Sequence, residues 1–175
     1  MSVLILHGVA NHRPPDHWEF QLAATLAAEG ARVAYPSLPD ADDPWPERWE
    51  AAILHEIAEL PGKPLVICHS LAVNAWLGLG PGIASHVDRV LLVAPPGQEA
   101  IAEVAPRFPA PEPFAAPAGW EVWCSDADPY NAVGALTTHG EPFGLPVRII
   151  EGAGHFTPDD GYGVWPDVVD WARGA

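Results

Sequence analysis

Basic residues are scarce in this sequence. Only 8 of its 175 residues are Lys or Arg, against 23 Asp and Glu, which gives a formal net charge of −15 at pH 7. Binding to nucleic acid depends on clustered cationic side chains that neutralise phosphates. The sequence therefore predicts no nucleic-acid partner, and its acidity favours solubility instead.

Long apolar runs and cysteines are also scarce. No apolar run approaches the roughly 20 residues that a membrane-spanning helix needs, so we expect no membrane partner. Residues 1–6 lack the basic region and cleavage site of a secretory signal, which favours a cytoplasmic location. The 2 cysteines, Cys68 and Cys124, each end an apolar run. We interpret them as small buried packing residues in a reducing compartment rather than as a redox pair.

The sequence does contain a regular alternation of apolar, β-rich runs with helix-like segments. Hydrophobic residues make up 49% of the chain and charged residues 18%, which is typical of one domain spanning residues 1–175. The alternation predicts an α/β fold: a mainly parallel central sheet with helices on both faces, in three α/β/α layers. The runs expected to form strands are Val3–Leu6, Arg32–Tyr35, Leu65–Cys68, Val90–Ala94, Glu121–Cys124 and Val147–Glu151.

Helical periodicity and helix-terminal residues mark three helices. The first carries apolar residues four apart from Trp18 and stops at Gly30. The second has Asp43 as its candidate N-cap and Pro44 in its first turn, and the last begins near Pro166.

The segment Pro95–Pro117 contains seven prolines, which interrupt any regular pattern. We interpret it as an extended surface loop of partly polyproline character. The loop is too short to form a separate cap domain, so the sequence predicts a fairly open site.

The apolar run that ends at Cys68 leads through His69 to Ser70 and then directly into a helix-like segment. This pattern is typical of a nucleophile elbow, the strained strand-to-helix turn that carries the reactive serine of α/β-hydrolases in the motif G-x-S-x-G. Cys68 and Ala72 stand where that motif has glycines. Both are small enough for the close backbone contacts of the turn, so Ser70 is the candidate nucleophile.

Two later loops offer the partners that a reactive serine needs. In α/β-hydrolases the chain order is Ser, then Asp or Glu, then His. Asp126 and Asp128 follow one expected strand, and His155 follows another in a glycine-rich turn. Ligands in parallel sheets bind outside the carboxyl ends of the strands, where these loops lie. We favour Asp128 as the carboxylate, since it directly precedes Pro129, and interpret Asp126 as a turn residue.

Two backbone N–H groups are expected to stabilise the oxyanion of the reaction. One donor follows the nucleophile and the other lies in an early strand-to-helix loop. Leu71 supplies the first, and Val9, which follows Gly8, is expected to supply the second. Asn11 and Arg13 in the same loop are candidates for the substrate pocket, and both can equally serve as anchors of the loop.

We expect neither a metal nor a cofactor. His7, His12 and His17 are spaced by five, which does not place them on one helical face, and there is no H-E-x-x-H motif. His69 is interpreted as a packing or hydrogen-bonding residue. The glycine-rich segment 78–82 follows a helix rather than opening one, so it is a turn and not a phosphate-binding loop.

Short motifs distributed over nearly the whole chain point to one family. They are Leu6-His7-Gly8, Asn11-His12-Arg13-Pro14 with Trp18, Cys68-His69-Ser70-Leu71, Ser125-Asp126-Ala127-Asp128-Pro129-Tyr130, Gly154-His155-Phe156 and Gly161-Tyr162-Gly163-Val164-Trp165-Pro166. Together they resemble the small serine hydrolase family of retinoblastoma-binding protein 9 and its bacterial YdeN-like relatives. The resemblance implies an α/β-hydrolase fold and a triad of Ser70, Asp128 and His155, in a family that tolerates residues other than glycine in the elbow.

We therefore predict a serine hydrolase that cleaves small carboxylic esters through an acyl-enzyme, with a small-molecule ester as its partner. Thioesters and amides fit the same triad. The alternative is a catalytically weak α/β-hydrolase fold that serves as a protein-binding module, which the non-glycine residues Cys68 and Ala72 favour. The sequence makes no prediction of oligomeric state.

Overall fold

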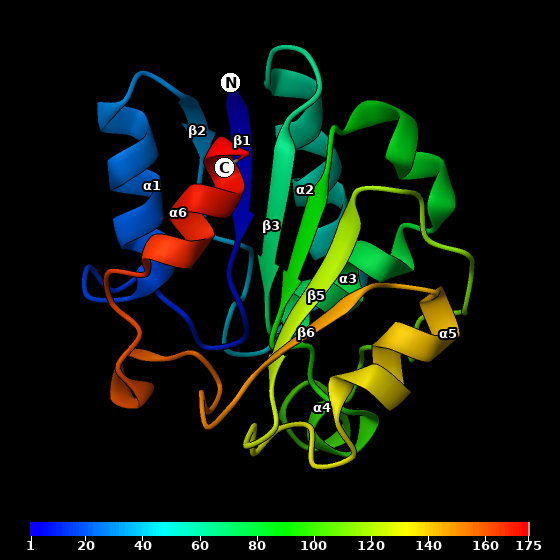
Figure 1. Cartoon of the computed structure of the whole chain (residues 1–175). Coiled ribbons are helices and arrows are strands. Elements are labelled where there is room, and N and C mark those ends of the chain that lie inside the picture. Colours follow the sequence, from blue (N-terminus) through cyan, green and yellow to red (C-terminus); the bar gives the residue numbers. More distant parts are fainter. Residues whose placement is uncertain (175) are drawn as a thin grey trace.

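Six parallel strands form one central sheet (Figure 1). A computed structural model describes residues 1–174 of the chain. The order of the strands across the sheet is β2-β1-β3-β4-β5-β6, and every neighbouring pair is parallel. The strands are β1 (Ser2–Leu6), β2 (Arg32–Ala34), β3 (Leu65–His69), β4 (Val90–Val93), β5 (Trp120–Ser125) and β6 (Val147–Ile150). All six predicted strands are confirmed, with ends that differ by at most one residue.

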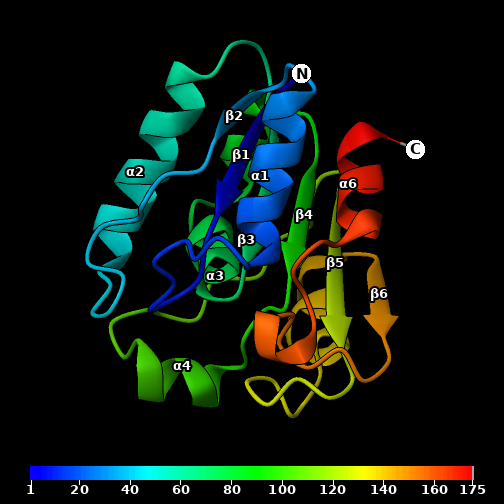
Figure 2. The same ribbon diagram turned by 90° about the vertical axis from the view of Figure 1, so that its left-hand side faces the viewer.

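Helices cover both faces of the sheet, which confirms the predicted three layers (Figures 1 and 2). Helices α1 and α6 pack on one face, and α2 and α3 on the other. The α-helices are α1 (Trp18–Ala28), α2 (Pro46–Glu59), α3 (Leu71–Gly78), α4 (Gln98–Val104), α5 (Glu141–Phe143) and α6 (Pro166–Arg173). Shorter turns are the 3₁₀-helices η1 (Pro81–His86) and η3 (Pro158–Asp160) and the π-helical turn η2 (Leu136–Gly140).

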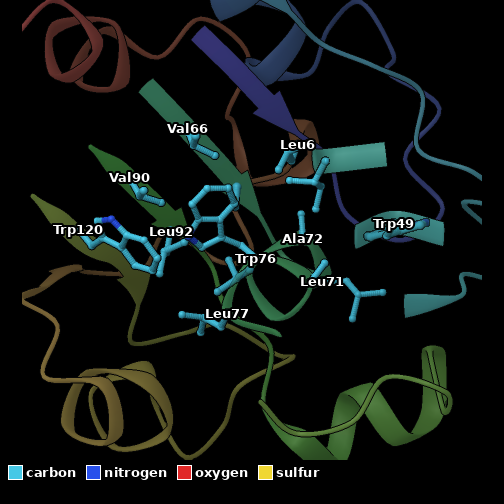
Figure 3. Close-up of a cluster of buried hydrophobic side chains, with 14 of the residues drawn as sticks. Leu6, Trp49, Val66, Leu71, Ala72, Trp76, Leu77, Val90, Leu92 and Trp120 are labelled. Carbon is cyan, nitrogen blue, oxygen red and sulfur yellow. The ribbon is translucent and has the colours of Figure 1, made fainter. Parts of the chain in front are cut away.

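The central strands β1, β3 and β4 are almost wholly apolar because both of their faces are buried. In β1, Leu4 and Leu6 face the layer of α2 and α3, whereas Val3 and Ile5 face the layer of α1 and α6. Strands of parallel sheets covered on both sides lack the polar and apolar alternation of half-exposed strands. Figure 3 shows the cluster on the α3 face, which includes Trp76 of α3.

The second helix begins later than the sequence predicted. Asp43 is not its N-cap, because α2 starts at Pro46 and Trp45 holds the N-cap position. A residue before proline is driven out of the helical region, and Trp45 has extended dihedral angles of φ −114° and ψ 123°. Pro46 then occupies the first helical position, where its missing N–H costs nothing.

We predicted that the proline-rich segment Pro95–Pro117 forms an extended loop. This prediction is wrong in part, because the segment contains helix α4. Its prolines lie at the two ends, so that residues 97–105 are free of them and form a helix that stops before Pro106. Ile101 of α4 is buried, and so are Ala105 and Phe108 just beyond it. Helix α4 lies at the edge of the sheet toward which the strand arrows point (Figure 2).

The order of the strands fixes where a site can form. From β1 the chain moves outward to β2 and then crosses back to β3 on the other side of β1. The loops that leave the carboxyl ends of β1 and β3 therefore diverge, which leaves a crevice at this switch point of the sheet. Within residues 1–174 no helix is long and apolar enough to cross a membrane.

We predict that Trp76→Ala destabilises the protein by about 3–5 kcal/mol, the usual cost of removing a buried aromatic side chain. Trp76 is fully buried, and the centroid of its ring lies 5.5 Å from that of Trp120. Urea unfolding followed by circular dichroism measures the loss. Leu54→Ala is the control, since Leu54 is 46% exposed and its loss should cost less than about 1 kcal/mol. Equal losses in the two variants would contradict the packing described here.

Candidate active site

Ser70 occupies the single position between β3 and α3, in a strained backbone conformation. Its dihedral angles are φ 55° and ψ −127°. A residue other than glycine at positive φ costs about 1–3 kcal/mol and persists only where the surroundings impose it. Here the Ser70 N–H donates to the carbonyl of Val93 at 2.9 Å, and the Val73 N–H donates to the carbonyl of Ser70 at 2.9 Å. The turn therefore has the shape of a nucleophile elbow.

Cys68 and Ala72 flank this turn and are both fully buried in the core on the α3 face. Their side chains fit without glycine at either position. Burial raises the pKa of the Cys68 thiol well above its ordinary value, so the thiol stays neutral. Both cysteines are buried and free, which confirms their predicted place in the packing.

Ser70, His155 and Asp128 form a continuous chain of hydrogen bonds. His155 Nε2 lies 2.9 Å from Ser70 Oγ, and Nδ1 lies 3.0 and 2.9 Å from the two carboxylate oxygens of Asp128. A carboxylate only accepts, so Nδ1 carries the proton and Nε2 is free to accept from the serine hydroxyl. All three residues are buried: Ser70 is 8% exposed, His155 is 7% exposed and Asp128 is 5% exposed. The three loops singled out from the sequence thus meet at one point.

The two aspartates of the β5 loop have different partners, which separates the alternatives that the sequence offered. Asp128 Oδ1 also accepts the N–H of Tyr130 at 2.9 Å, which fixes the carboxylate beside the imidazole. Asp126 Oδ1 accepts the N–H of Gly152 at 2.7 Å, in the loop that follows β6. Asp126 is therefore more than a turn residue: it ties the loop of Asp128 to the loop of His155.

The turn that carries His155 is built around Asp160, a residue that our sequence analysis missed. Asp160 Oδ2 accepts the N–H groups of His155 and Thr157, each at 3.0 Å, and the hydroxyl of Thr157 at 2.8 Å. Burial acts to raise the pKa of Asp160, but these hydrogen bonds outweigh it and lower that pKa. A Cβ at Gly154 would lie 2.1 Å from Asp160 Oδ1, so only glycine fits there. The spacing of Thr157 and Asp160 is that of a capping box, a signal that could have revealed the pair.

His69, the residue before Ser70, also contacts the turn that carries His155. Its Nε2 lies 2.9 Å from the carbonyl oxygen of His155, and the two ring centroids are 5.0 Å apart. Burial, with smaller contributions from His155 and His17, lowers the pKa of His69 well below its ordinary value. A neutral His69 that donates to His155 is the hydrogen-bonding residue expected from the sequence.

The loop after β1 brings Gly8 and Val9 against Ser70. A Cβ at Gly8 would lie 2.7 Å from the Cβ and 3.2 Å from the Oγ of Ser70, so this approach excludes any side chain. The Val9 N–H takes part in none of the hydrogen bonds formed among residues 1–174. Leu71 is the first residue of α3, where an N–H has no acceptor within the helix. Val9 and Leu71, whose N–H groups the sequence analysis selected as oxyanion donors, therefore both line the cavity beside Ser70.

A cavity of about 630 Å³ opens above Ser70 and His155. Part of its wall is apolar and is formed by Pro96, which precedes α4, and by Ala100 and Val104 of α4. Helix α4, which the sequence analysis did not predict, thus contributes to the shape of the site.

Asn11 lines this cavity, but Arg13 does not. The guanidinium of Arg13 donates to the carbonyl of Tyr35 at 2.7 Å and lies over the ring of Tyr35, 5.7 Å from its centroid. Asn11 Oδ1 accepts the N–H of Arg13 at 2.7 Å. For Arg13 the structure thus favours the interpretation as a loop anchor, while Asn11 serves the loop and borders the cavity.

Glu19 lies behind the cavity and is completely buried. Its Oε2 accepts from Asn11 Nδ2 at 2.9 Å and from the Tyr35 hydroxyl at 3.2 Å, while Oε1 has no partner among the described residues. Burial raises the pKa of Glu19 from its ordinary value of 4.5 to about 8. A carboxyl group in this position is largely protonated at neutral pH.

His17, Glu19 and His69 place ligand-type atoms within 4.8 Å of one another. Each of the three side chains already takes part in a hydrogen bond: His17 Nδ1 accepts the N–H of Glu19 at 3.3 Å, and the bonds of Glu19 and His69 are those given above. We assign no metal to this group.

The family model described as serine hydrolase matches residues 3–172. The chain belongs to the serine hydrolase family. Among curated proteins, none matches the sequence.

Solved structures show the same α/β-hydrolase fold. A YdeN-like hydrolase from Pectobacterium atrosepticum has a TM-score of 0.79 at 19% identity, over 97% of this chain and 88% of its own. The ydeN gene product of Bacillus subtilis has a TM-score of 0.75 at 18% identity, over 99% and 97%. A monoacylglycerol lipase from Paleococcus ferrophilus has a TM-score of 0.67 at 14% identity, over 99% and 94%. The predicted fold and the resemblance to YdeN-like serine hydrolases are confirmed.

We predict that Glu19→Gln changes the pH dependence of stability. The folded protein holds a proton on Glu19 that the unfolded chain releases, so the free energy of unfolding of the parent falls as pH rises from about 4.5 to about 8. The glutamine variant lacks this dependence. Between pH 5 and pH 8 its stability relative to the parent should therefore rise by at least about 1.4 kcal/mol, the equivalent of one pKa unit.

Urea unfolding at the two pH values measures this change. Glu59→Gln, at an exposed position of α2, is the matched control and should track the parent at both pH values. A Glu19→Gln variant that also tracks the parent would show that the buried carboxyl group titrates normally.

Proposed function

We propose that this serine hydrolase cleaves carboxylic esters, with Ser70 as nucleophile, His155 as general base and Asp128 as the carboxylate that orients the imidazole. The observation that carries the proposal is the chain of hydrogen bonds from Ser70 Oγ through His155 to Asp128, beside a cavity large enough for a small ligand. That one of the structural neighbours is a monoacylglycerol lipase supports esters over other acyl compounds.

In the first step His155 Nε2 takes the proton of Ser70 as Oγ attacks the carbonyl carbon of the ester. Asp128 holds Nδ1–H and stabilises the imidazolium that forms. The tetrahedral intermediate then expels the alcohol, which receives the proton from His155, and an acyl group remains on Ser70. Water repeats the sequence with His155 as base, which releases the acid and restores the serine.

The N–H groups of Val9 and Leu71 are proposed to bind the oxyanion of the intermediate. Both residues line the cavity next to Ser70. Leu71 stands at the N-terminus of α3, where the helix dipole also favours negative charge. Loss of one such donor typically lowers the rate on the order of 100- to 1,000-fold. Thioesters and amides follow the same steps with a different leaving group.

Labelling with a fluorophosphonate tests this proposal. We expect one adduct on the parent, seen by intact-protein mass spectrometry and located at Ser70. Ser70→Ala should give none, and His155→Ala and Asp128→Asn should lower the rate of butyrate ester hydrolysis by on the order of 10⁴-fold. Folded parent protein that takes no label and cleaves no ester would contradict the proposal and favour the protein-binding alternative.

We predict that Gly8→Ala lowers kcat/KM for a short-chain ester by about 100-fold or more. The new Cβ would collide with Ser70 and move the nucleophile or the Val9 N–H, and displacements of about 1 Å at a reacting centre have effects of this size. Gly82→Ala is the matched control, because a Cβ at Gly82 meets no atom within 4 Å. Steady-state kinetics on both variants measures the effect, and an active Gly8→Ala enzyme would contradict the close approach.

A further inference from the structure

The lining of the cavity contains no lysine or arginine in the described part of the chain. Asp42 is the lining carboxylate. The side chain of Asp42 is 72% exposed, and its Oδ1 lies within hydrogen-bond distance of His12 Nε2, at 3.0 Å. A substrate in this cavity therefore meets a carboxylate and no fixed cation.

Two of the lining histidines are neutral at physiological pH. Burial lowers the pKa of His17 to about 4 and that of His69 well below its ordinary value. His69 is also engaged with the carbonyl of His155. Neither of these two rings supplies a positive charge, and the other lining histidines are His12, which contacts Asp42, and His155, which contacts Ser70 and Asp128.

The arginines near the cavity already have partners. Arg13 donates to the carbonyl of Tyr35. Arg48 pairs with Asp40 and Arg107 pairs with Asp43, so these two guanidinium groups are held by the other aspartates of the segment 40–43 and not by Asp42. The formal net charge of −15 adds a negative field over the whole molecule.

We propose that the cavity selects substrates by charge: it takes uncharged esters and esters with a cationic alcohol, and it rejects anionic ones, with Asp42 as the specificity-determining residue. This rests on the proposed function and narrows it. Thioesters on a carrier that bears phosphates, such as coenzyme A, are disfavoured because their recognition relies on Arg or Lys, which this cavity lacks.

Binding to Ser70→Ala protein separates this proposal from catalysis. The probes are three butyrate esters of similar size: butyrylcholine, its uncharged isostere with carbon in place of the ammonium nitrogen, and the butyrate ester of glycolate. Calorimetry at pH 8 and low ionic strength gives their dissociation constants. A carboxylate about 4 Å from a cation in water changes affinity about fivefold. We therefore expect butyrylcholine to bind about fivefold more tightly than the isostere, and the glycolate ester at least about fivefold more weakly.

The added substitution Asp42→Asn should bring the ratio between butyrylcholine and its isostere close to one. Asp88→Asn removes the same charge at an exposed site outside the cavity and is the matched control, which should retain the ratio. Equal binding of the glycolate ester and the isostere, or a ratio unaffected by Asp42→Asn, would overturn the proposal. Because the binding is measured without turnover, this result is distinct from a failure of the parent to hydrolyse the uncharged ester, which would contradict the proposed function.

Discussion

The parallel pairing of β1 with β3 is the constraint on which the site depends. Leu6 lies opposite Cys68 in this pair, so both strands end at the same level, and the first residues beyond them lie close together before the two loops diverge. Gly8 consequently meets Ser70 at a distance that only glycine allows. Pairing of β3 with β4 adds the bond from Ser70 N–H to the carbonyl of Val93, which holds the serine at a positive φ. The strain at the elbow is thus sustained by the two strands on either side of β3.

The histidine is held by contacts that reach it from separate parts of the chain. His69, next to Ser70, donates to the carbonyl of His155, and Asp160 accepts the backbone N–H of His155. Asp126 joins the loop that follows β5 to the loop that follows β6. These bonds fix the backbone of the loops, and Asp128 fixes the ring itself. A site whose groups are held before substrate arrives needs little rearrangement as charge develops, which is the main source of electrostatic catalysis.

Burial keeps the polar groups around this histidine uncharged. It lowers the pKa values of His17 and His69 and raises that of Glu19, each toward the neutral form. The imidazolium proposed for the reaction thus forms beside Asp128 without a second cation at His17 or His69. The buried groups beside the imidazole are thus neutral, whereas Asp42 in the cavity lining and the molecule as a whole are acidic, and this contrast underlies the proposed preference for uncharged and cationic substrates.

The sequence by itself determined the six strands, the three layers and the residues that meet at the site, because apolar runs and the serine, aspartate and histidine after them are properties of short segments. It also placed Cys68 and Ala72 in an elbow that tolerates small side chains. It did not determine the helix within the proline-rich segment, the contacts of Arg13, or the support that His69 gives to His155, whereas the capping-box spacing of Thr157 and Asp160 was a local signal. Some of these features are contacts between residues that are distant in the chain. The others depend on the course of a segment, which its neighbours in the fold determine. Only the order and pairing of the strands brings such residues together, and local propensity carries no record of that order.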